Sequence, residues 1–203
     1  MNQVLEGLDV SRETYEALES FHEIILKWNS RINLVSKSSV SDIWNRHIWD
    51  SAQLIQFAEV SGKWLDIGSG GGFPGLIVAI FLKQLHPEVE VTLVESDQRK
   101  SAFLRTVIRE LDLNAVVLTS RVEVIEIQRA EVLSARALAD LGQLLKYGDQ
   151  HLSKTGKALF LKGEKWEKEV QIARDVWSFD LCVHKSKTNS AAAILEIKEI
   201  ERV

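Results

Sequence analysis

The chain has 203 residues, of which 45% are hydrophobic and 27% charged, as in a globular protein with a full core. Its longest apolar run, Leu76–Leu82, is too short to span a membrane, and its acidic N-terminal segment is unlike a signal peptide. One cysteine excludes a disulfide framework and a cysteine-rich metal site. We therefore expect a cytoplasmic protein with neither membrane partner nor metal. The net charge of −4 disfavours a general nucleic-acid binder, which would carry a basic surface.

Residues 1–60 have the spacing of amphipathic helices. Apolar side chains recur at helical intervals over residues 15–26, with Ser11 as the predicted N-cap, and again over residues 43–55. We expect an N-terminal helical extension over 1–60, packed on a ligand-binding domain formed by residues 61–203.

From residue 63 onward, predicted strands and helices alternate. We expect strands at 64–67, 89–95, 115–118, 131–135, 157–162, 179–184 and 192–198, and helices at 76–85, 98–111, 122–128, 138–151 and 164–175. This alternation predicts a doubly wound α/β domain with a mainly parallel sheet. The short connection between the last two strands predicts that they pair antiparallel.

The first of these strands ends at Asp66 and leads into a glycine-rich loop that includes Gly68 and Gly70 and ends at Pro74. Glycines allow the backbone to approach a ligand closely at the carboxyl edge of a sheet. The loop fits a dinucleotide fingerprint, but Asp66 would repel a pyrophosphate and Pro74 lacks an N–H to bind one. S-adenosylmethionine has no phosphate, and its sulfonium and ammonium groups favour a nearby carboxylate. We therefore predict S-adenosylmethionine as the cofactor.

Glu95 ends the next strand. A carboxylate there can accept hydrogen bonds from both hydroxyls of a ribose. NAD and S-adenosylmethionine both contain a ribose, so Glu95 supports a nucleoside ligand without deciding between them.

Several further motifs occur in order along the chain. They are Trp28–Ser36, Arg46–Ser51 (Arg-His-Ile-Trp-Asp-Ser), the Asp66–Gly75 loop, Glu95-Ser96, Phe103–Arg105, Ser120–Glu123, Ala135–Ala137 and Leu161–Gly163. Together they closely resemble the RsmG (GidB) family of bacterial small-subunit rRNA guanine-N7 methyltransferases, from about residue 15 to the end of the chain. The glycine loop alone indicates only a class I methyltransferase, whereas the Arg46–Ser51 block and the Phe-Pro-Gly ending of the loop are more specific.

The resemblance implies a class I (Rossmann-like) methyltransferase with a seven-stranded sheet, helices on both faces and an N-terminal helical extension. It implies S-adenosylmethionine-dependent N7-methylation of a specific guanosine in 16S rRNA. The expected partner is 16S rRNA or the 30S subunit rather than DNA, and we expect a monomer. Cofactor contacts are implied at the positions of Gly68, Phe73, Val122, Glu123 and Arg136, in addition to Asp66, Gly70 and Glu95. Phe73 is expected to contribute backbone or packing contacts.

The chemistry of this reaction needs no general base, because guanine N7 has a free lone pair and no proton to lose. We therefore predict no catalytic acid or base, and the enzyme's task is alignment of the reacting atoms. The candidate RNA contacts are Lys27, Asn29, Arg31, Arg46, Arg121 and Lys162.

Each functional interpretation has an ordinary structural alternative. Arg46 can pair with Asp42 or Asp50 on its own helix, Glu123 can stabilise the helix that it begins, and His47 fits a core histidine better than a catalytic one. The competing functions are a methyltransferase of proteins or small molecules, an NAD-dependent oxidoreductase, and an assembly factor that binds S-adenosylmethionine without turnover.

Overall fold

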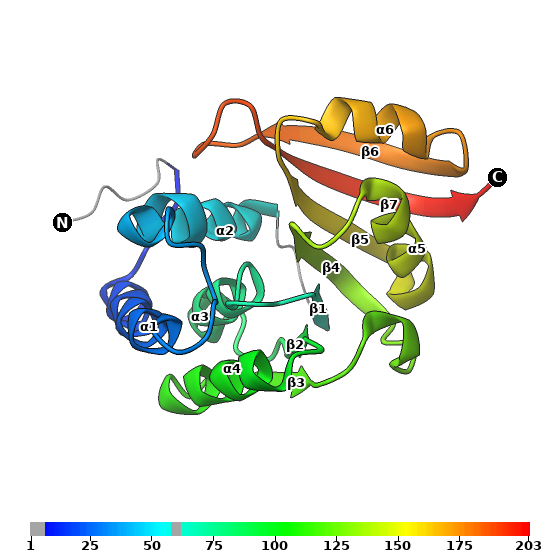
Figure 1. Cartoon of the computed structure of the whole chain (residues 1–203). Coiled ribbons are helices and arrows are strands. Elements are labelled where there is room, and N and C mark those ends of the chain that lie inside the picture. The colour runs from blue at the N-terminus through cyan, green and yellow to red at the C-terminus, as the bar shows by residue number, and fades with distance from the viewer. Residues whose placement is uncertain (1–6, 58–61) are drawn as a thin grey trace.

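The computed structural model describes residues 7–57 and 62–203 (Figure 1). The boundary that we expected between residues 60 and 61 lies outside the described residues. No helix within the described ranges is long and apolar enough to cross a membrane.

A single seven-stranded sheet forms the centre of the fold, in the order β3-β2-β1-β4-β5-β7-β6. The first five strands are parallel, and β7 runs antiparallel to both β5 and β6. The strands are β1 (Trp64–Ile67), β2 (Val91–Val94), β3 (Ala115–Leu118), β4 (Ala130–Arg136), β5 (Leu152–Lys162), β6 (Trp177–Lys185) and β7 (Ala193–Arg202). The doubly wound, mainly parallel architecture and the antiparallel final pair are both confirmed.

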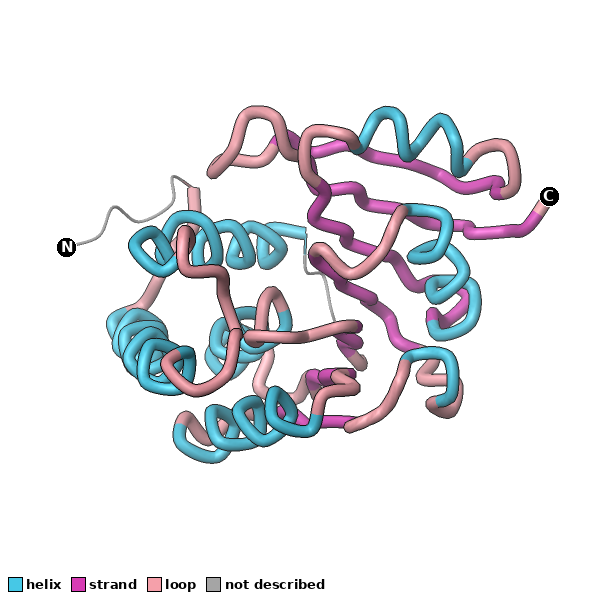
Figure 2. The backbone as a smooth tube through the Cα atoms, viewed as in Figure 1, coloured by secondary structure: helices cyan, strands magenta, loops and turns pink. Residues whose placement is uncertain are grey.

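Helices cover both faces of the sheet (Figure 2). Side chains alternate between the faces of a strand, so Trp64 packs in one apolar core with α1, α3 and α4, and Leu65 packs in the other with α5 and α6. The helices are α1 (Arg12–Asn29), α3 (Gly75–Leu85), α4 (Gln98–Glu110), α5 (Leu141–His151) and α6 (Trp166–Ala173). Because α1 shares a core with the sheet, the N-terminal part of the chain is packed directly on the α/β fold.

The start of α1 follows the expected capping. The Ser11 hydroxyl accepts the Thr14 amide at 3.0 Å, which satisfies one of the free N–H groups of the first turn. Leu18, Phe21 and Ile25 on the inner side of α1 are fully buried.

The second N-terminal helix differs from our expectation, because residues 40–57 form a series of short turns of different pitch. They are a 3₁₀ turn (Val40–Asp42), a π-helix (Trp44–Trp49), α2 (Asp50–Ala52) and a second 3₁₀ segment (Gln53–Phe57). Within the π-helix the Arg46 carbonyl accepts a hydrogen bond from the distant side chain of Arg136 at 3.1 Å. A side chain that inserts into the helical ladder is one cause of such widened turns.

The helix expected over 122–128 is also wrong, since only one 3₁₀ turn forms (Val122–Val124). The Val122 carbonyl bonds to Nε2 of His151 at 3.1 Å, and Arg129 adopts a positive φ of 49° just before β4. The next helix begins at Leu141 rather than 138, because the Asp140 carboxylate caps it by accepting the Gln143 amide at 3.0 Å.

Candidate active site

The loops that follow β1, β2, β3 and β4 meet at the carboxyl edge of the sheet, the edge where open α/β folds bind ligands. Gly68 and Gly70 follow β1, Glu95 follows β2, Val122 follows β3 and Arg136 ends β4. Residues that lie far apart in the sequence are thus collected at one edge.

The glycine loop uses backbone conformations that other residues rarely adopt. Gly68 and Gly70 have φ values of +65° and +52°, in the left-handed region that favours glycine. A Cβ atom on Gly68 would lie 2.5 Å from Cδ1 of Leu138. The loop therefore leaves no room for a side chain at Gly68.

Glu95 ties this loop to the second strand. Its Oε2 accepts the Gly70 amide at 2.9 Å and its Oε1 accepts the Asp97 amide at 2.7 Å, and the residue is 8% exposed. Each carboxylate oxygen has two lone pairs, so both oxygens can still accept a hydroxyl. The arrangement fits a ribose bound beside the glycine loop.

Asp66 lies beneath the loop, with no exposed surface. Its Oδ1 accepts the Ser134 hydroxyl at 2.7 Å, and the Ser134 oxygen accepts the indole N–H of Trp64 at 2.9 Å. No donor among the described residues reaches Oδ2 in hydrogen-bond geometry. We expected this carboxylate to face the ligand, and the structure instead places its charge under the loop, away from the surface.

Burial raises the pKa of Asp66 to about 6. The hydroxyls of Ser69 and Ser134, the Gly75 amide and the positive charge of Arg136 oppose this rise. The carboxyl group is therefore a proton-binding site close to neutral pH.

Arg136 reaches from the end of β4 into the π-helix. Its Nη1 donates to the Arg46 carbonyl at 3.1 Å and lies 3.4 Å from Oδ2 of Asp50, and its Nη2 lies 2.7 Å from Nδ1 of His47. We call this set of contacts the Arg136 clasp. Its guanidinium also lies over the Phe73 ring, 4.9 Å from the centroid, so the clasp joins β4, the glycine loop and the N-terminal segment.

The clasp fixes the protonation of His47. Arginine has only donors, so Nδ1 of His47 accepts the bond and the ring proton lies on Nε2. Burial, followed by the charges of Arg136 and Arg46, lowers the pKa of His47 to about 4. The neutral ring stacks on Phe73, with 5.0 Å between centroids. Phe73 is thus a packing centre for the site.

The cofactor contacts expected at Val122 and Glu123 are bonded to side chains from α5. His151 bonds to the Val122 carbonyl, and the Tyr147 hydroxyl donates to the Glu123 carboxylate. The Tyr147 hydrogen bond lowers the pKa of Glu123, so this exposed carboxylate is ionised and partly engaged.

A cleft of about 910 Å³ is lined in part by Leu138, the residue that packs against Gly68 of the glycine loop. It is bounded by the π-helix, the loop after β4, the end of β5 and the connection between β6 and β7. Thr188 from that connection donates to Oδ1 of Asp50 at 2.8 Å, so the far wall is fastened to the clasp. The charged side chains described in its lining are Asp42, Asp50, Asp140 and Glu169 against Arg46, Arg136 and Lys162. The cleft is therefore polar, with carboxylates outnumbering cations.

The predicted RNA contacts do not form one patch. Arg46 lies on the cleft, Arg31 lines a separate cavity, and Lys27 and Arg121 are exposed. Arg46 forms no ion pair with Asp42 or Asp50 in the described part of the chain, because Asp50 pairs with Arg136 instead.

Two of these residues have internal partners. Oδ1 of Asn29 accepts the amides of Leu34 and Val35 at 2.8 and 3.0 Å, which shapes the loop after α1. The Lys162 ammonium, 8% exposed, lies 2.6 Å from Glu169 and donates to the Ala139 carbonyl at 2.9 Å. A direct RNA contact through Lys162 would require breaking this buried pair, so the structure gives it a supporting position instead.

Comparison with known proteins identifies the chain. A family model described as rRNA small subunit methyltransferase G matches residues 14–197. The chain belongs to the rRNA small subunit methyltransferase G family.

Relatives in this family are similar over nearly their whole length. The Ribosomal RNA small subunit methyltransferase G of Ruegeria sp. (strain TM1040) is 50% identical, over 97% of this chain and 96% of the relative. That of Ruegeria pomeroyi is 48% identical with the same coverage. Among solved structures, a TehB-like SAM-dependent methyltransferase from Corynebacterium glutamicum has a TM-score of 0.58 at 16% identity, covering 91% of this chain and 98% of that chain. This last likeness supports the fold alone.

The structure gives His47 and Asp50 contacts that our sequence analysis did not predict. We assigned Arg46 to RNA and treated His47 as a core residue, yet His47 and Asp50 from the same motif are the partners of Arg136. The occurrence of His47 and Asp50 in one motif was the sequence signal that could have indicated a shared role. Tyr147 and His151, which bond to Glu123 and Val122, carried no comparable local signal.

Gly68→Ala should weaken cofactor binding while the fold survives. The added Cβ meets Leu138 and imposes a strained φ, so we expect affinity for S-adenosylhomocysteine to fall at least about tenfold, or ~1.4 kcal/mol. Isothermal calorimetry measures this, and Gly163→Ala is the matched control because its Cβ meets nothing within 4 Å. Equal affinity in both variants would remove the glycine loop from the cofactor site.

Asp66→Asn should change how stability depends on pH. The folded-state pKa of about 6 lies above the ordinary 3.8, so this carboxyl contributes its full stabilisation below pH 3.8 and loses it as the pH rises through 6. Relative to the variant, the wild type should lose on the order of 3 kcal/mol of unfolding free energy between about pH 4 and about pH 7. Urea denaturation of both proteins across this range measures it. A difference that stays constant with pH contradicts the assignment.

Proposed function

We propose that this chain transfers the methyl group of S-adenosylmethionine to N7 of a specific guanosine in 16S rRNA. The observation that carries the proposal is similarity to the rRNA small subunit methyltransferase G family along residues 14–197, which includes both the glycine loop and the cleft beside it. The choice of guanine N7 as the methyl acceptor rests on the resemblance of the sequence motifs to guanine-N7 methyltransferases.

We assign cofactor binding to residues around the glycine loop. The backbone at Gly68 and Gly70 approaches the ligand, Glu95 accepts the ribose hydroxyls, and Val122 with Glu123 borders the adenine. Phe73 packs beneath Arg136, whose fork keeps N–H groups beyond those used in the clasp. When bound, S-adenosylmethionine supplies an electrophilic methyl group on a positively charged sulfur.

The chain's own residues have to align the base rather than deprotonate it. Guanine N7 attacks with a free lone pair, so positioning can provide much of the rate, up to roughly 7–11 kcal/mol. The purine gains positive charge during transfer, and the carboxylates Asp50 and Asp140 lie in the lining of the cleft. Fixed negative charge at that position stabilises the product side of the reaction.

The proposal extends to the location of the enzyme, the form of its RNA substrate and its oligomeric state. An rRNA substrate places the enzyme in the cytoplasm, and the net charge of −4 favours recognition of a structured site in 16S rRNA or the 30S subunit over general binding to DNA. We propose that it acts as a monomer.

Methyl transfer to purified 30S subunits from a strain that lacks this gene tests the proposal. We expect radiolabel from S-adenosylmethionine to enter 16S rRNA, and nucleoside mass spectrometry to identify it as N7-methylguanosine at one position. Arg136→Lys keeps the charge but loses the planar fork, so its rate should fall at least about tenfold, or ~1.4 kcal/mol. Arg109→Lys, the same change at an exposed position of α4 outside the cleft, should keep the wild-type rate.

Other outcomes distinguish the competing functions. Label in protein or in small molecules would indicate a different methyltransferase, and cofactor binding without turnover on any fraction would indicate an assembly factor. Binding of a nicotinamide cofactor in place of S-adenosylmethionine would indicate an oxidoreductase.

A further inference from the structure

A second cavity, of about 330 Å³, lies between the loop after α1 and the first turn of α4. Asn29–Asn33 form one wall, and Asp97, Arg99 and Lys100 form the other. The two walls come from segments about seventy residues apart, which is why no sequence motif marked the cavity.

Hydrogen bonds hold both walls in place. The loop is closed by the Asn29 side chain, which accepts the Leu34 and Val35 amides, and by the Arg31 amide, which donates to the Trp28 carbonyl at 2.9 Å. On the other wall, Oδ1 of Asp97 accepts the amides of Arg99 and Lys100 at 2.8 and 3.1 Å. The cations of the cavity therefore project from ordered backbone.

The charge of the cavity is opposite to that of the chain. Three cations, Arg31, Arg99 and Lys100, face one carboxylate, Asp97, in a chain with a net charge of −4. Asp97 is committed to capping α4 and lies 3.4 Å from Nη2 of Arg99. Arg31 and Lys100 form no ion pair within the described ranges. A concave site with unpaired cations attracts an anion.

We propose that this basic pocket, formed by Arg31, Arg99 and Lys100, binds a phosphodiester of the rRNA backbone. Arginine forks match the oxygens of a phosphate, and contacts of this kind set the register of a protein on nucleic acid. The proposal rests on the proposed function, because it supplies the anchor for the RNA whose guanosine enters the cleft.

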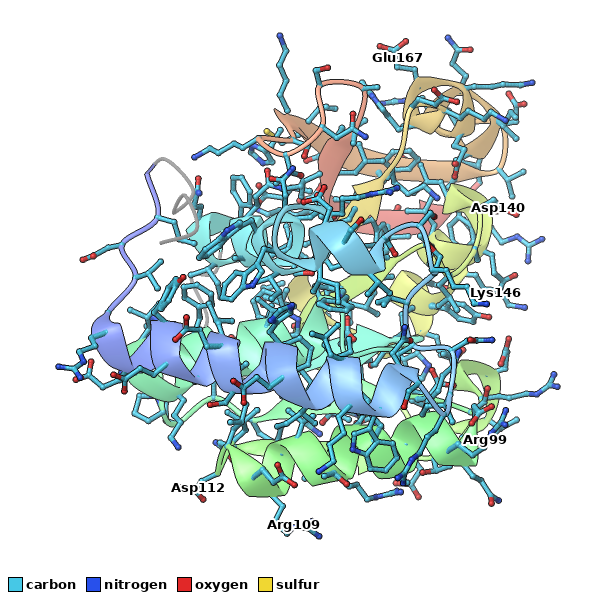
Figure 3. The ribbon with its side chains drawn as sticks, turned by 60° about the vertical axis from the view of Figure 1, so that its left-hand side comes forward. Arg99, Arg109, Asp112, Asp140, Lys146 and Glu167 are labelled. Atoms are coloured by element: carbon cyan, nitrogen blue, oxygen red, sulfur yellow. The ribbon has the colours of Figure 1, made fainter. Side chains whose placement is uncertain are left out.

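The position of the pocket favours RNA over a small anion. Asp97 is hydrogen-bonded to Glu95, which in turn holds the Gly70 amide, so the pocket adjoins the glycine loop on its β2 side. The cleft lies at the ends of β4 and β5, on the other side of β1 in the sheet order. Arg99 from the pocket and Asp140 from the cleft project on the same side of the molecule (Figure 3). An extended polymer can occupy both cavities along this edge, whereas a free phosphate would gain nothing from the cleft.

The test compares two triple variants of the whole protein. Arg31→Gln/Arg99→Gln/Lys100→Gln neutralises the pocket. Arg109→Gln/Arg129→Gln/Arg202→Gln removes the same charge from exposed positions at the opposite edge of the sheet, and Figure 3 shows Arg109 toward the far end of α4 from Arg99. Binding to 30S subunits is measured from about 50 to about 200 mM salt.

We expect the pocket variant to flatten the plot of log affinity against log salt by about one unit, the effect of one lost phosphate contact. The control should keep the wild-type slope. Both variants should bind S-adenosylhomocysteine like the wild type, which shows that they are folded. Arg31→Lys/Arg99→Lys, with the charge retained, should also keep the slope.

Equal slopes in the pocket variant and the control would overturn the proposal. It would also be overturned if the pocket variant lost affinity for inorganic phosphate but kept the wild-type slope with 30S subunits, because the pocket would then serve a small anion. These measurements do not depend on turnover. Failure of the proposed function would instead be seen as absent N7-methylguanosine with the wild-type protein.

Discussion

The site depends on the hydrogen bonds and the ion pair of the guanidinium of Arg136, whose side chain is 17% exposed. This side chain leaves the end of β4, lies over Phe73 of the glycine loop, and bonds to Arg46, His47 and Asp50. A largely buried cation is costly unless it is paired and hydrogen-bonded, so these contacts favour the observed position of the N-terminal segment. Thr188 fastens the β6–β7 connection to the same Asp50. Arg136 and Asp50 together thereby link β4, the N-terminal segment and the β6–β7 connection around the cleft.

Backbone groups form most of the contacts in one part of the site, and side chains form the other part. Around the glycine loop, the contacts are mostly backbone groups oriented by carboxylates, with Glu95 holding Gly70 and Asp66 placed beneath. In the cleft, charged side chains form the lining. This division suits a reaction that needs alignment and a favourable field rather than proton transfer. The cations proposed for RNA lie outside the glycine loop, so substrate binding can vary without disturbing the cofactor.

The sequence predicted the structure correctly where neighbouring residues determine the local conformation. The strands β1 and β3 have the expected bounds, because short apolar runs end at turn residues, and the glycine loop follows from residues that need left-handed φ. It was uninformative where a distant partner decides the outcome. The π-helix at Trp44–Trp49 depends on a side chain from β4, and Lys162 is paired with Glu169 rather than exposed. The basic pocket likewise exists only because α1 ends beside the first turn of α4.

Hydrogen–deuterium exchange with and without S-adenosylhomocysteine tests the central claim, that Arg136 links the cofactor site to the N-terminal segment. If Arg136 is shared between the two, binding should slow exchange of the amides of residues 44–52 together with those of the glycine loop. In Arg136→Ala, protection should be confined to the glycine loop. Protection confined to the glycine loop in the wild type as well would contradict the account.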